Sequence, residues 1–316
     1  MDNWGDMPSL KCDGVDIMLA VTGITGHTGR FLIDELARAQ YCGKIKCLVR
    51  TKSKADYLLK SGLNVEIIDG TLDSEKALED LMKGVDTVVH IAGIKHSCDI
   101  LRVGKLCNVR RFVLVHTTGI YSKFKAASNE YIKIEKAILP LMEEQNITIV
   151  RPTMIFGDIC DYNVSKFIRF VDRMPILPIV GGGGSLVQSV NARDLAQGLF
   201  KILQTEKSCG KAYVLSGEKA ITIRQLYRMI GKDLNKRRII VGIPMWTCVL
   251  GARVIKACSN GRVDLVEKVQ RMGEDRAYDH ALATEDLGYS PEPFEMGLKR
   301  EIEQYLARKM AYKQSL

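Results

Sequence analysis

The chain lacks any long apolar run. None of its apolar stretches reaches the ~18 residues of a membrane-spanning helix, so we expect no transmembrane segment. Its opening, residues 1–6, is acidic and polar, unlike the basic and then apolar start of a signal peptide. The nine cysteines are scattered, form no Cys-x-x-Cys pair and are odd in number, which argues against a disulfide framework. These absences together predict a cytoplasmic protein.

Nucleic-acid signals are also lacking, although the net charge is +9. No basic stripe is interleaved with aromatic residues, so we expect no nucleic-acid partner. The excess of cations leaves three explanations: solvated helix faces, a membrane surface, or an anionic substrate or cofactor. His96 and Cys98 are close in sequence but have no convergent partner set, so no metal site is expected.

What the chain does have is a glycine-rich turn at residues 22–29, set between an apolar, β-prone segment and a helical pattern. Strand, glycine turn and helix are the context that a dinucleotide-binding fingerprint requires. Gly23 permits a sharp turn, Gly26 lets the backbone approach a diphosphate, and Gly29 lets the helix pack closely on the strand. The diphosphate would be held by free N–H groups at the positive end of the helix dipole.

Strand and helix patterns alternate through the first half of the 316-residue chain. This alternation predicts a parallel sheet with right-handed crossovers, and therefore a doubly wound α/β fold of Rossmann type. His90 and His116 lie on expected strands and are predicted to be hydrogen-bonded core groups. The expected strands are residues 16–21, 44–50, 65–69, 87–92, 111–116 and 147–151, and the expected helices are 30–39, 55–60, 75–83, 99–107 and 129–144.

The alternation stops after Pro152. Prolines and a run of four glycines make residues 172–184 an expected loop. Further helices are expected at 191–203 and 222–230, and a strand at 213–217. We predict a dinucleotide-binding domain at 1–157, to which 186–205 returns, and a smaller substrate-binding lobe made of 158–185 and 206–316.

The segment 236–257 begins with three cations and continues mostly apolar. We favour a helix that covers the substrate lobe, because the apolar run is short and interrupted by glycine and proline. The alternative is an interfacial helix that makes peripheral membrane contact.

The residue after the second strand selects the cofactor. An acid there binds the ribose 2′-hydroxyl of NAD, whereas an arginine accepts the 2′-phosphate of NADP. This chain has Arg50, then Lys52 and Lys54, and no acid before Asp56. We therefore predict NADP, with NAD as the alternative; solvated loop cations remain a competing explanation.

Several short motifs follow the expected strands in a fixed order. They are TGITGHTG at 22–29, DGTL at 69–72, IAG at 91–93, TTGIY at 117–121, RPTMIFG at 151–157, VQSVNARDLA at 187–196, DRAYD at 275–279 and DLGYSP at 286–291. With these motifs the chain resembles, over nearly its whole length, the short-chain dehydrogenase/reductase superfamily in its extended and atypical branches, near the NAD-dependent epimerase/dehydratases.

The resemblance implies hydride transfer to or from a nicotinamide, with Thr117 and Tyr131 in the catalytic hydroxyl and tyrosine positions. It implies cofactor contacts by Gly23, Thr25, Gly26, His27, Thr28, Gly29, Arg50, Leu72, Ala92, Gly93 and Pro152. Arg151, Lys166, Arg169 and Arg276 are candidate partners for substrate phosphates.

One position departs from the family pattern. The lysine expected four residues after Tyr131, one helical turn on, is Glu135. A carboxylate there would raise the pKa of the tyrosine rather than lower it. Lys133 and Lys136 flank the position but face other sides of the helix.

Two functions follow. The first is an NAD(P)-dependent oxidoreductase, epimerase or dehydratase acting on a polar small molecule, with a nucleotide sugar favoured. The second, suggested by Glu135, is a non-catalytic NADP(H)-binding sensor or structural subunit. A homodimer is compatible with either.

Overall fold

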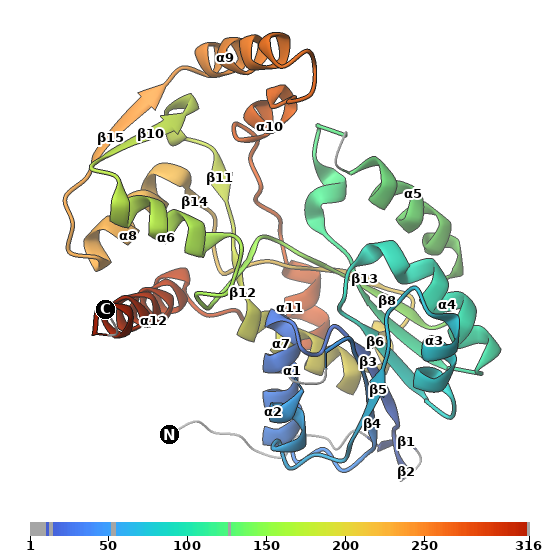
Figure 1. Cartoon of the computed structure of the whole chain (residues 1–316). Helices are drawn as coiled ribbons and strands as arrows, with labels where there is room; N and C mark the ends of the chain where they lie inside the picture. The colour runs from blue at the N-terminus through green and yellow to red at the C-terminus, as the bar shows by residue number, and fades with distance from the viewer. Residues whose placement is uncertain (1–10, 13–14, 52–54, 126–127, 315–316) are drawn as a thin grey trace.

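A seven-stranded parallel sheet forms the centre of the molecule (Figure 1). The computed structural model describes residues 11–12, 15–51, 55–125 and 128–314. The strand order is β13-β8-β7-β6-β3-β4-β5, and all six pairings are parallel. The strands are β3 (Leu19–Thr22), β4 (Ile45–Val49), β5 (Val65–Asp69), β6 (Thr87–His90), β7 (Arg111–Val115), β8 (Ile147–Pro152) and β13 (Ala212–Leu215). The predicted doubly wound α/β fold is confirmed.

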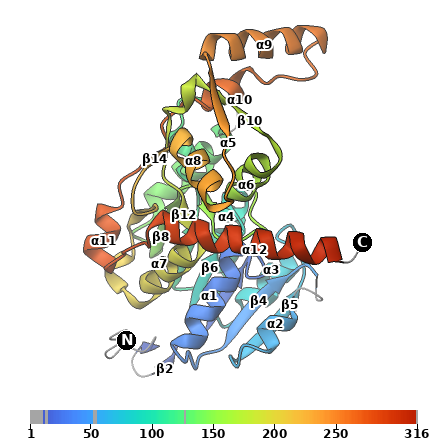
Figure 2. The ribbon, with the colours of Figure 1, turned by 90° about the vertical axis from the view of Figure 1, so that its left-hand side faces the viewer.

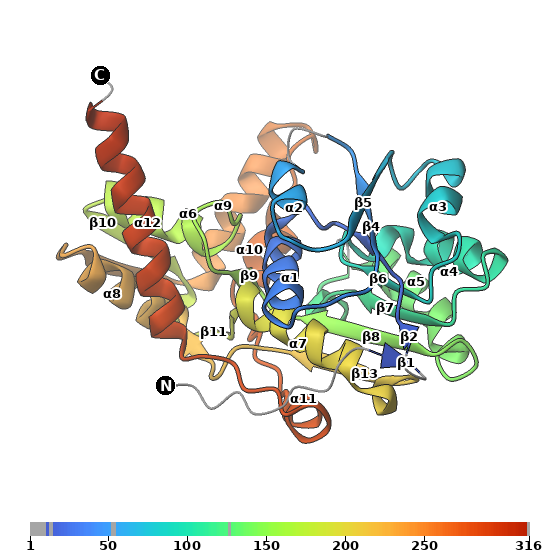
Figure 3. The ribbon, with the colours of Figure 1, turned by 90° about the horizontal axis from the view of Figure 1, so that it is seen from below.

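Helices cover both faces of this sheet, which explains why β3, β4, β6 and β8 are buried along their whole length. One face packs against α1 (His27–Arg38), α2 (Asp56–Leu59), α7 (Ala192–Gln204) and α11 (Ala281–Leu287). The other packs against α3 (Glu75–Met82), α4 (Ser97–Leu106) and α5 (Asn129–Ile138). Figure 3 shows the two layers on either side of the sheet. The chain turns back between β3 and β6, the switch point at which doubly wound sheets bind ligands.

A smaller lobe with its own apolar core lies beside the carboxyl ends of these strands. Its helices are α6 (Val164–Arg173), α8 (Ile223–Asp233) and α12 (Phe294–Gln314). Two further helices, α9 (Met245–Cys258) and α10 (Val266–Arg271), stand at its far end. The short strands outside the central sheet are β1 (Lys11–Cys12), β2 (Val15–Asp16), β9 (Ile155–Phe156), β10 (Ile176–Val180), β11 (Leu186–Val187), β12 (Val190–Asn191), β14 (Ile221–Thr222) and β15 (Ile239–Ile243).

Side chains cap two of the expected helices at their first turn. The Ser74 side chain accepts a hydrogen bond from the Ala77 N–H at the start of α3. Thr222 caps α8 through a complete capping box with Gln225. α5 ends at Ile138, well before residue 144, because Pro140 follows and cannot donate to a continuing helix.

Residues 172–184 were expected to be a loop, and this is wrong for β10. Ile176 to Val180 pair in parallel with β15, residue for residue. The covering helix was expected within residues 236–257, but the first part of that segment forms β15. Helix α9 therefore begins only at Met245, after Pro244. The β-branched run in β15 favours a strand once a partner strand is beside it.

The substrate-binding lobe was expected to consist of residues 158–185 and 206–316, but part of 206–316 belongs to the sheet domain. β13 pairs with β8 and completes the central sheet. Tyr213 of β13 and Leu287 of α11 belong to the core cluster that α1 and α7 share. The sheet domain therefore takes two elements from the C-terminal part of the chain. Among the described residues, no helix combines the length and hydropathy needed to cross a bilayer.

Candidate functional site

The turn after β3 has the backbone that the glycine fingerprint requires. Gly23 has φ +75°, and a Cβ placed on it would lie 2.8 Å from the Ala92 nitrogen. A Cβ on Gly29 would lie 2.4 Å from the Ile24 carbonyl oxygen. Side chains at these two positions would collide with backbone atoms, so only glycine allows β3, β6 and α1 to approach this closely.

The first turn of α1 fits a diphosphate. It contains no acidic residue, and no side chain caps it at Gly26. Its N–H groups therefore face outward with the positive end of the helix dipole, the arrangement that binds phosphate oxygens. His27 stands beside this turn with its Nε2 3.2 Å from a carboxylate oxygen of Asp158. Burial raises the pKa of Asp158, but His27, the Cys160 N–H and Arg30 together outweigh burial, and the pKa lies below its usual value.

The other predicted cofactor residues follow neighbouring strands at the same edge of the sheet. Arg50 is exposed directly after β4, Leu72 is half-buried after β5, and Ala92 and Gly93 follow β6. Because the strands are parallel, the structure brings these positions to one edge. Lys52 and Lys54 lie outside the described residues.

His90 holds the turn that carries Ala92. The His90 Nε2 atom donates to the Gly93 carbonyl oxygen at 2.7 Å, and Nδ1 accepts from the Thr22 hydroxyl at 2.6 Å. Burial lowers the pKa of His90 to about 4, so the ring is neutral at pH 7. The prediction that His90 is a hydrogen-bonded core group is confirmed.

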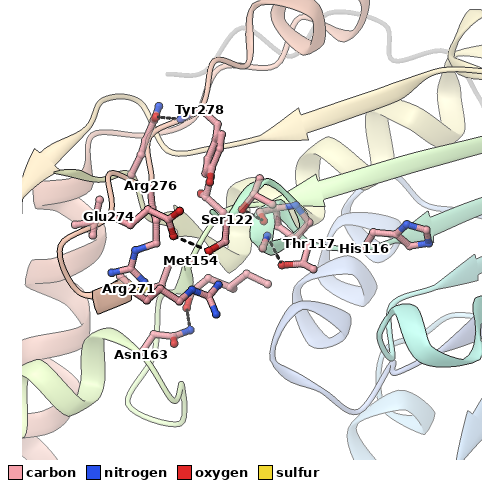
Figure 4. A pocket seen from close by; sticks show the side chains of 16 residues that line it. His116, Thr117, Ser122, Met154, Asn163, Arg271, Glu274, Arg276 and Tyr278 are labelled. Atoms are coloured by element: carbon pink, nitrogen blue, oxygen red, sulfur yellow. Dashed lines mark hydrogen bonds between the residues drawn. The ribbon is translucent and has the colours of Figure 1, made fainter. Parts of the chain in front are cut away.

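A cavity of about 280 Å³ opens at the carboxyl ends of β7 and β8 (Figure 4). Its walls come from the sheet domain on one side and from the segment after α10 on the other. The lining residues are His116, Thr117, Thr118, Gly119, Ser122, Pro152, Thr153, Met154, Ile155, Asn163, Val187, Gln188, Arg271, Glu274, Arg276 and Tyr278.

Thr117 stands where the resemblance expects a catalytic hydroxyl. Its Oγ1 accepts a hydrogen bond from the Gly119 N–H at 3.0 Å, which fixes the side chain at the cavity wall. Within the described ranges its hydroxyl proton has no acceptor, so it can be donated to a bound oxygen. The neighbouring Thr118 is buried and donates to the Pro152 carbonyl oxygen at 3.0 Å, which ties β7 to β8.

Two arginines face Thr117 across the cavity. Arg271 ends α10 and Arg276 lies five residues further along the chain. In the part of the chain that the structure describes, the buried Nε atoms of both arginines lack a hydrogen-bond partner. Burial, with the neighbouring Arg271, lowers the pKa of Arg276, yet a guanidinium stays charged near neutral pH. Two half-buried guanidinium groups with unpaired Nε donors are suited to an anion, although the Glu274 carboxylate lines the same cavity.

Of the four predicted phosphate partners, only Arg276 reaches the cavity. Lys166 is exposed and stacks on the Tyr162 ring. Arg169 donates to the Ser165 hydroxyl at 2.7 Å, within α6. Arg151 is held by Glu135, as described next.

Glu135 occupies the family's lysine position and binds two residues of the sheet. Its Oε1 accepts from the Arg151 Nε at 2.9 Å and Nη2 at 2.7 Å, and its Oε2 accepts from the His116 Nδ1 at 2.8 Å. All three side chains are buried. Burial raises the pKa of Glu135, but the bonds from His116 and Arg151 outweigh it and hold the pKa below its usual value. The carboxylate therefore serves a buried ion-pair network, and His116 is confirmed as a hydrogen-bonded core group.

Tyr131 does not join the site. It is half-buried on α5 and is not among the residues that line the cavity. The cavity contains Tyr278 instead, whose ring lies 5.5 Å from that of Tyr121. Sequence reasoning missed Arg271, Glu274 and Tyr278, because their relation to Thr117 appears only when residues more than 150 positions apart are folded together. Glu274 connects these two segments of the chain, because it accepts hydrogen bonds from the Ser122 hydroxyl and the Lys123 N–H.

Comparison with known proteins identifies the class. A family model described as NAD(P)H-binding matches residues 23–163. The NADH dehydrogenase (ubiquinone) 1 alpha subcomplex subunit 9 of Dictyostelium discoideum mitochondria is 27% identical over 235 residues, which cover 68% of this chain and 63% of that protein. The chloroplast divinyl chlorophyllide a 8-vinyl-reductase of Arabidopsis thaliana is 26% identical over 257 residues, covering 73% of this chain and 60% of that protein. The chain thus matches less than two thirds of the length of these relatives.

Solved structures share the fold over almost the whole chain. UDP-glucuronic acid 4-epimerase from Bacillus cereus, in complex with UDP-glucuronic acid and NAD, has a TM-score of 0.71 at 16% identity, covering 91% of this chain and 98% of that one. Residues 23–163 form an NAD(P)H-binding Rossmann domain. The chain has the fold that its resemblance to the extended short-chain dehydrogenases/reductases predicts: a superfamily member from Agrobacterium tumefaciens shares it with a TM-score of 0.70 at 15% identity, covering 95% of this chain and 100% of that one.

Proposed function

We propose that this protein is an NADP(H)-dependent oxidoreductase or epimerase that acts on a small anionic molecule. The observation that carries the proposal is the cavity in which Thr117 faces Arg271 and Arg276. The cavity contains a hydroxyl that can donate a hydrogen bond, and beside it two cations that can bind an anionic group. It lies at the same edge of the sheet as the predicted cofactor residues.

NADP(H), when bound, would supply hydride exchange at its nicotinamide. The glycine turn and the first turn of α1 would hold the diphosphate, and Arg50 the 2′-phosphate. Thr117 would donate a hydrogen bond to the reacting oxygen of the substrate. Arg271 and Arg276 would bind the anionic group and so fix the distance between that oxygen and Thr117.

A nucleotide sugar is the substrate class we favour. Its diphosphate suits two guanidinium groups, and its sugar hydroxyls suit a cavity lined by threonine, asparagine and glutamine. The similarity to the Bacillus cereus epimerase, solved with UDP-glucuronic acid, supports this choice.

The test is turnover by the NADPH- or NADP-loaded protein over a panel of nucleoside-diphosphate sugars and sugar phosphates, against uncharged sugars. Arg276→Met should lower kcat/KM by about 10- to 100-fold, the value of a charge-assisted hydrogen bond, with cofactor affinity unchanged. Arg228→Met, on the exposed side of α8, is the matched control. If Arg276→Met and Arg228→Met behave alike on every substrate, the arginine pair is not the anion site.

Glu135 favours a second function, a non-catalytic NADP(H) sensor or structural subunit. The lysine of the family pattern is replaced by an acid that is committed to Arg151 and His116. Tight NADPH binding without turnover on any substrate of the panel would support this second function. Activity that Thr117→Val abolishes would support the enzyme.

A further inference from the structure

Helix α9 leaves most of its apolar side chains uncovered. Trp246 is 69% exposed, Leu250 55% and Val254 54%. Among its residues only Ala252 is fully buried. The expectation that this helix covers the substrate lobe is therefore wrong for its outer face, since a covering helix buries its apolar stripe.

The exposed residues form one continuous stripe. Trp246, Leu250 and Val254 are four residues apart, so they lie above one another on a single face of the helix. The strand that leads into α9 also has an exposed apolar side chain at its first residue, Ile239, which is 65% exposed. Figures 1 and 2 show α9 at the end of the molecule furthest from α1 and α2, lying crosswise over that end. A flat surface can therefore meet the whole helix without touching the central sheet.

The sequence around the stripe is basic, although Lys236, which precedes β15, is paired with Asp172 of α6. Residues 236–262 contain six cations and no acidic residue. Arg253 is exposed on α9 next to Val254, and Arg262 is exposed just beyond the helix. The nearest acid that follows, Asp264, lies 2.6 Å from Lys256 and is neutralised by it. An apolar stripe bordered by the exposed Arg253 and Arg262 is complementary to an anionic surface, and the same arginines disfavour contact with a second copy of the stripe.

We propose that α9 docks this protein on the surface of an anionic phospholipid membrane. The 14 residues of α9 span about 21 Å, which is too short to cross a bilayer. A helix with an apolar face, a tryptophan and flanking arginines lies in the interface plane instead, with its apolar side chains among the acyl chains. Trp246 would sit at the headgroup level, as tryptophan does in membrane proteins. Arg253 and Arg262 would bind lipid phosphates.

The experiment is flotation of the full chain with large unilamellar vesicles, either pure phosphatidylcholine or phosphatidylcholine mixed with phosphatidylglycerol. We expect binding to the mixed vesicles that weakens as salt is raised. In a Trp4→Phe background Trp246 is the one remaining tryptophan, and its emission should shift to the blue on mixed vesicles. Absence of binding to the mixed vesicles would overturn the proposal.

Variants test which residues make the contact. Trp246→Ser with Leu250→Ser should lower the affinity for mixed vesicles by about tenfold or more, because two apolar side chains no longer leave water. Arg253→Gln should lower it about fivefold. The control pair is Leu106→Ser with Met310→Ser, at two equally exposed apolar positions on α4 and α12.

Two further outcomes would overturn the docking role of α9. One is an equal loss of vesicle binding in the control pair, which would mean unspecific adsorption. The other is a dimer in ultracentrifugation that Trp246→Ser with Leu250→Ser dissociates, without vesicle binding, which would mean that a second copy covers α9. NADPH affinity should stay unchanged in every variant, so the result does not depend on the proposed reaction.

Discussion

The glycine turn before α1 and the buried Glu135–Arg151–His116 network beside α5 differ in which atoms set their geometry. In the turn, backbone atoms do the work, and any side chain on Gly23 or Gly29 would collide with neighbouring backbone. In the network, the geometry is set by side chains: Glu135, at the position where the resemblance expects a lysine, accepts hydrogen bonds from Arg151 and His116. The turn therefore depends on glycine at two positions, whereas the network depends on the side chains of Glu135, Arg151 and His116.

The largest effect should come from breaking the network. Glu135→Ala leaves Arg151 as a buried charge without its partner, so we expect a loss of about 3–5 kcal/mol in the free energy of unfolding. Urea denaturation measures it. Glu144→Ala, at an exposed position after α5, is the control and should change stability little. A small loss in Glu135→Ala would mean that the network does not hold α5 to the sheet.

The same network makes a pH prediction. The pKa of Glu135 lies below its usual value of 4.5 in the folded protein. Its contribution to stability is therefore present above about pH 4.5 and is lost as the pH falls below it. Glu135→Gln keeps the shape and lacks this titration. The stability difference between wild type and Glu135→Gln should be constant near pH 7 and shrink below pH 4.5, in urea titrations at each pH.

The glycine turn should respond less in stability but directly in binding. Gly29→Ala places a Cβ 2.4 Å from the Ile24 carbonyl oxygen, so β3 and α1 must separate. We expect a loss of about 1–3 kcal/mol in stability. Calorimetry should also show weaker NADPH binding, since the first turn of α1 moves. Gly251→Ala, where a Cβ meets open space on α9, is the control. Unchanged NADPH affinity in Gly29→Ala would show that the glycine turn is not part of the cofactor site.

The contrast between the two regions also explains which features of the structure could be predicted from the sequence. The sequence predicted the central strands because each is a short and mostly apolar run, which is a local property; four of them, β3, β4, β6 and β8, are buried along their whole length. β10 was missed because its partner β15 lies 63 residues further along the chain, and without that partner its prolines and glycines indicate a loop. The departure at Glu135 was visible in the sequence.

The partners of Glu135 could not be predicted, because His116 follows β7, Arg151 lies in β8, and both meet α5 only in the folded chain. Arg271 and Tyr278 were missed for the same reason. Arg271 ends α10 and Tyr278 follows it, and no periodicity in the chain links this helix to Thr117. The sequence thus indicated the glycine turn, whose geometry is local, and could not indicate contacts between side chains from distant segments.

The smallest effect tests cofactor choice at the glycine-turn edge. Arg50 is exposed directly after β4, so its interaction with a 2′-phosphate is partly screened by water. Arg50→Ala should weaken NADPH binding about tenfold and leave NADH binding unchanged, since only NADPH carries the phosphate. Arg110→Ala is the control, because Arg110 is exposed just before β7, at the opposite edge of the sheet. Calorimetry with both nucleotides gives the ratio. An unchanged ratio of the two affinities would show that Arg50 is a solvated loop cation, and the predicted preference for NADP would then have no support. The predicted diphosphate site at α1 would not be affected, because it depends on the glycine turn.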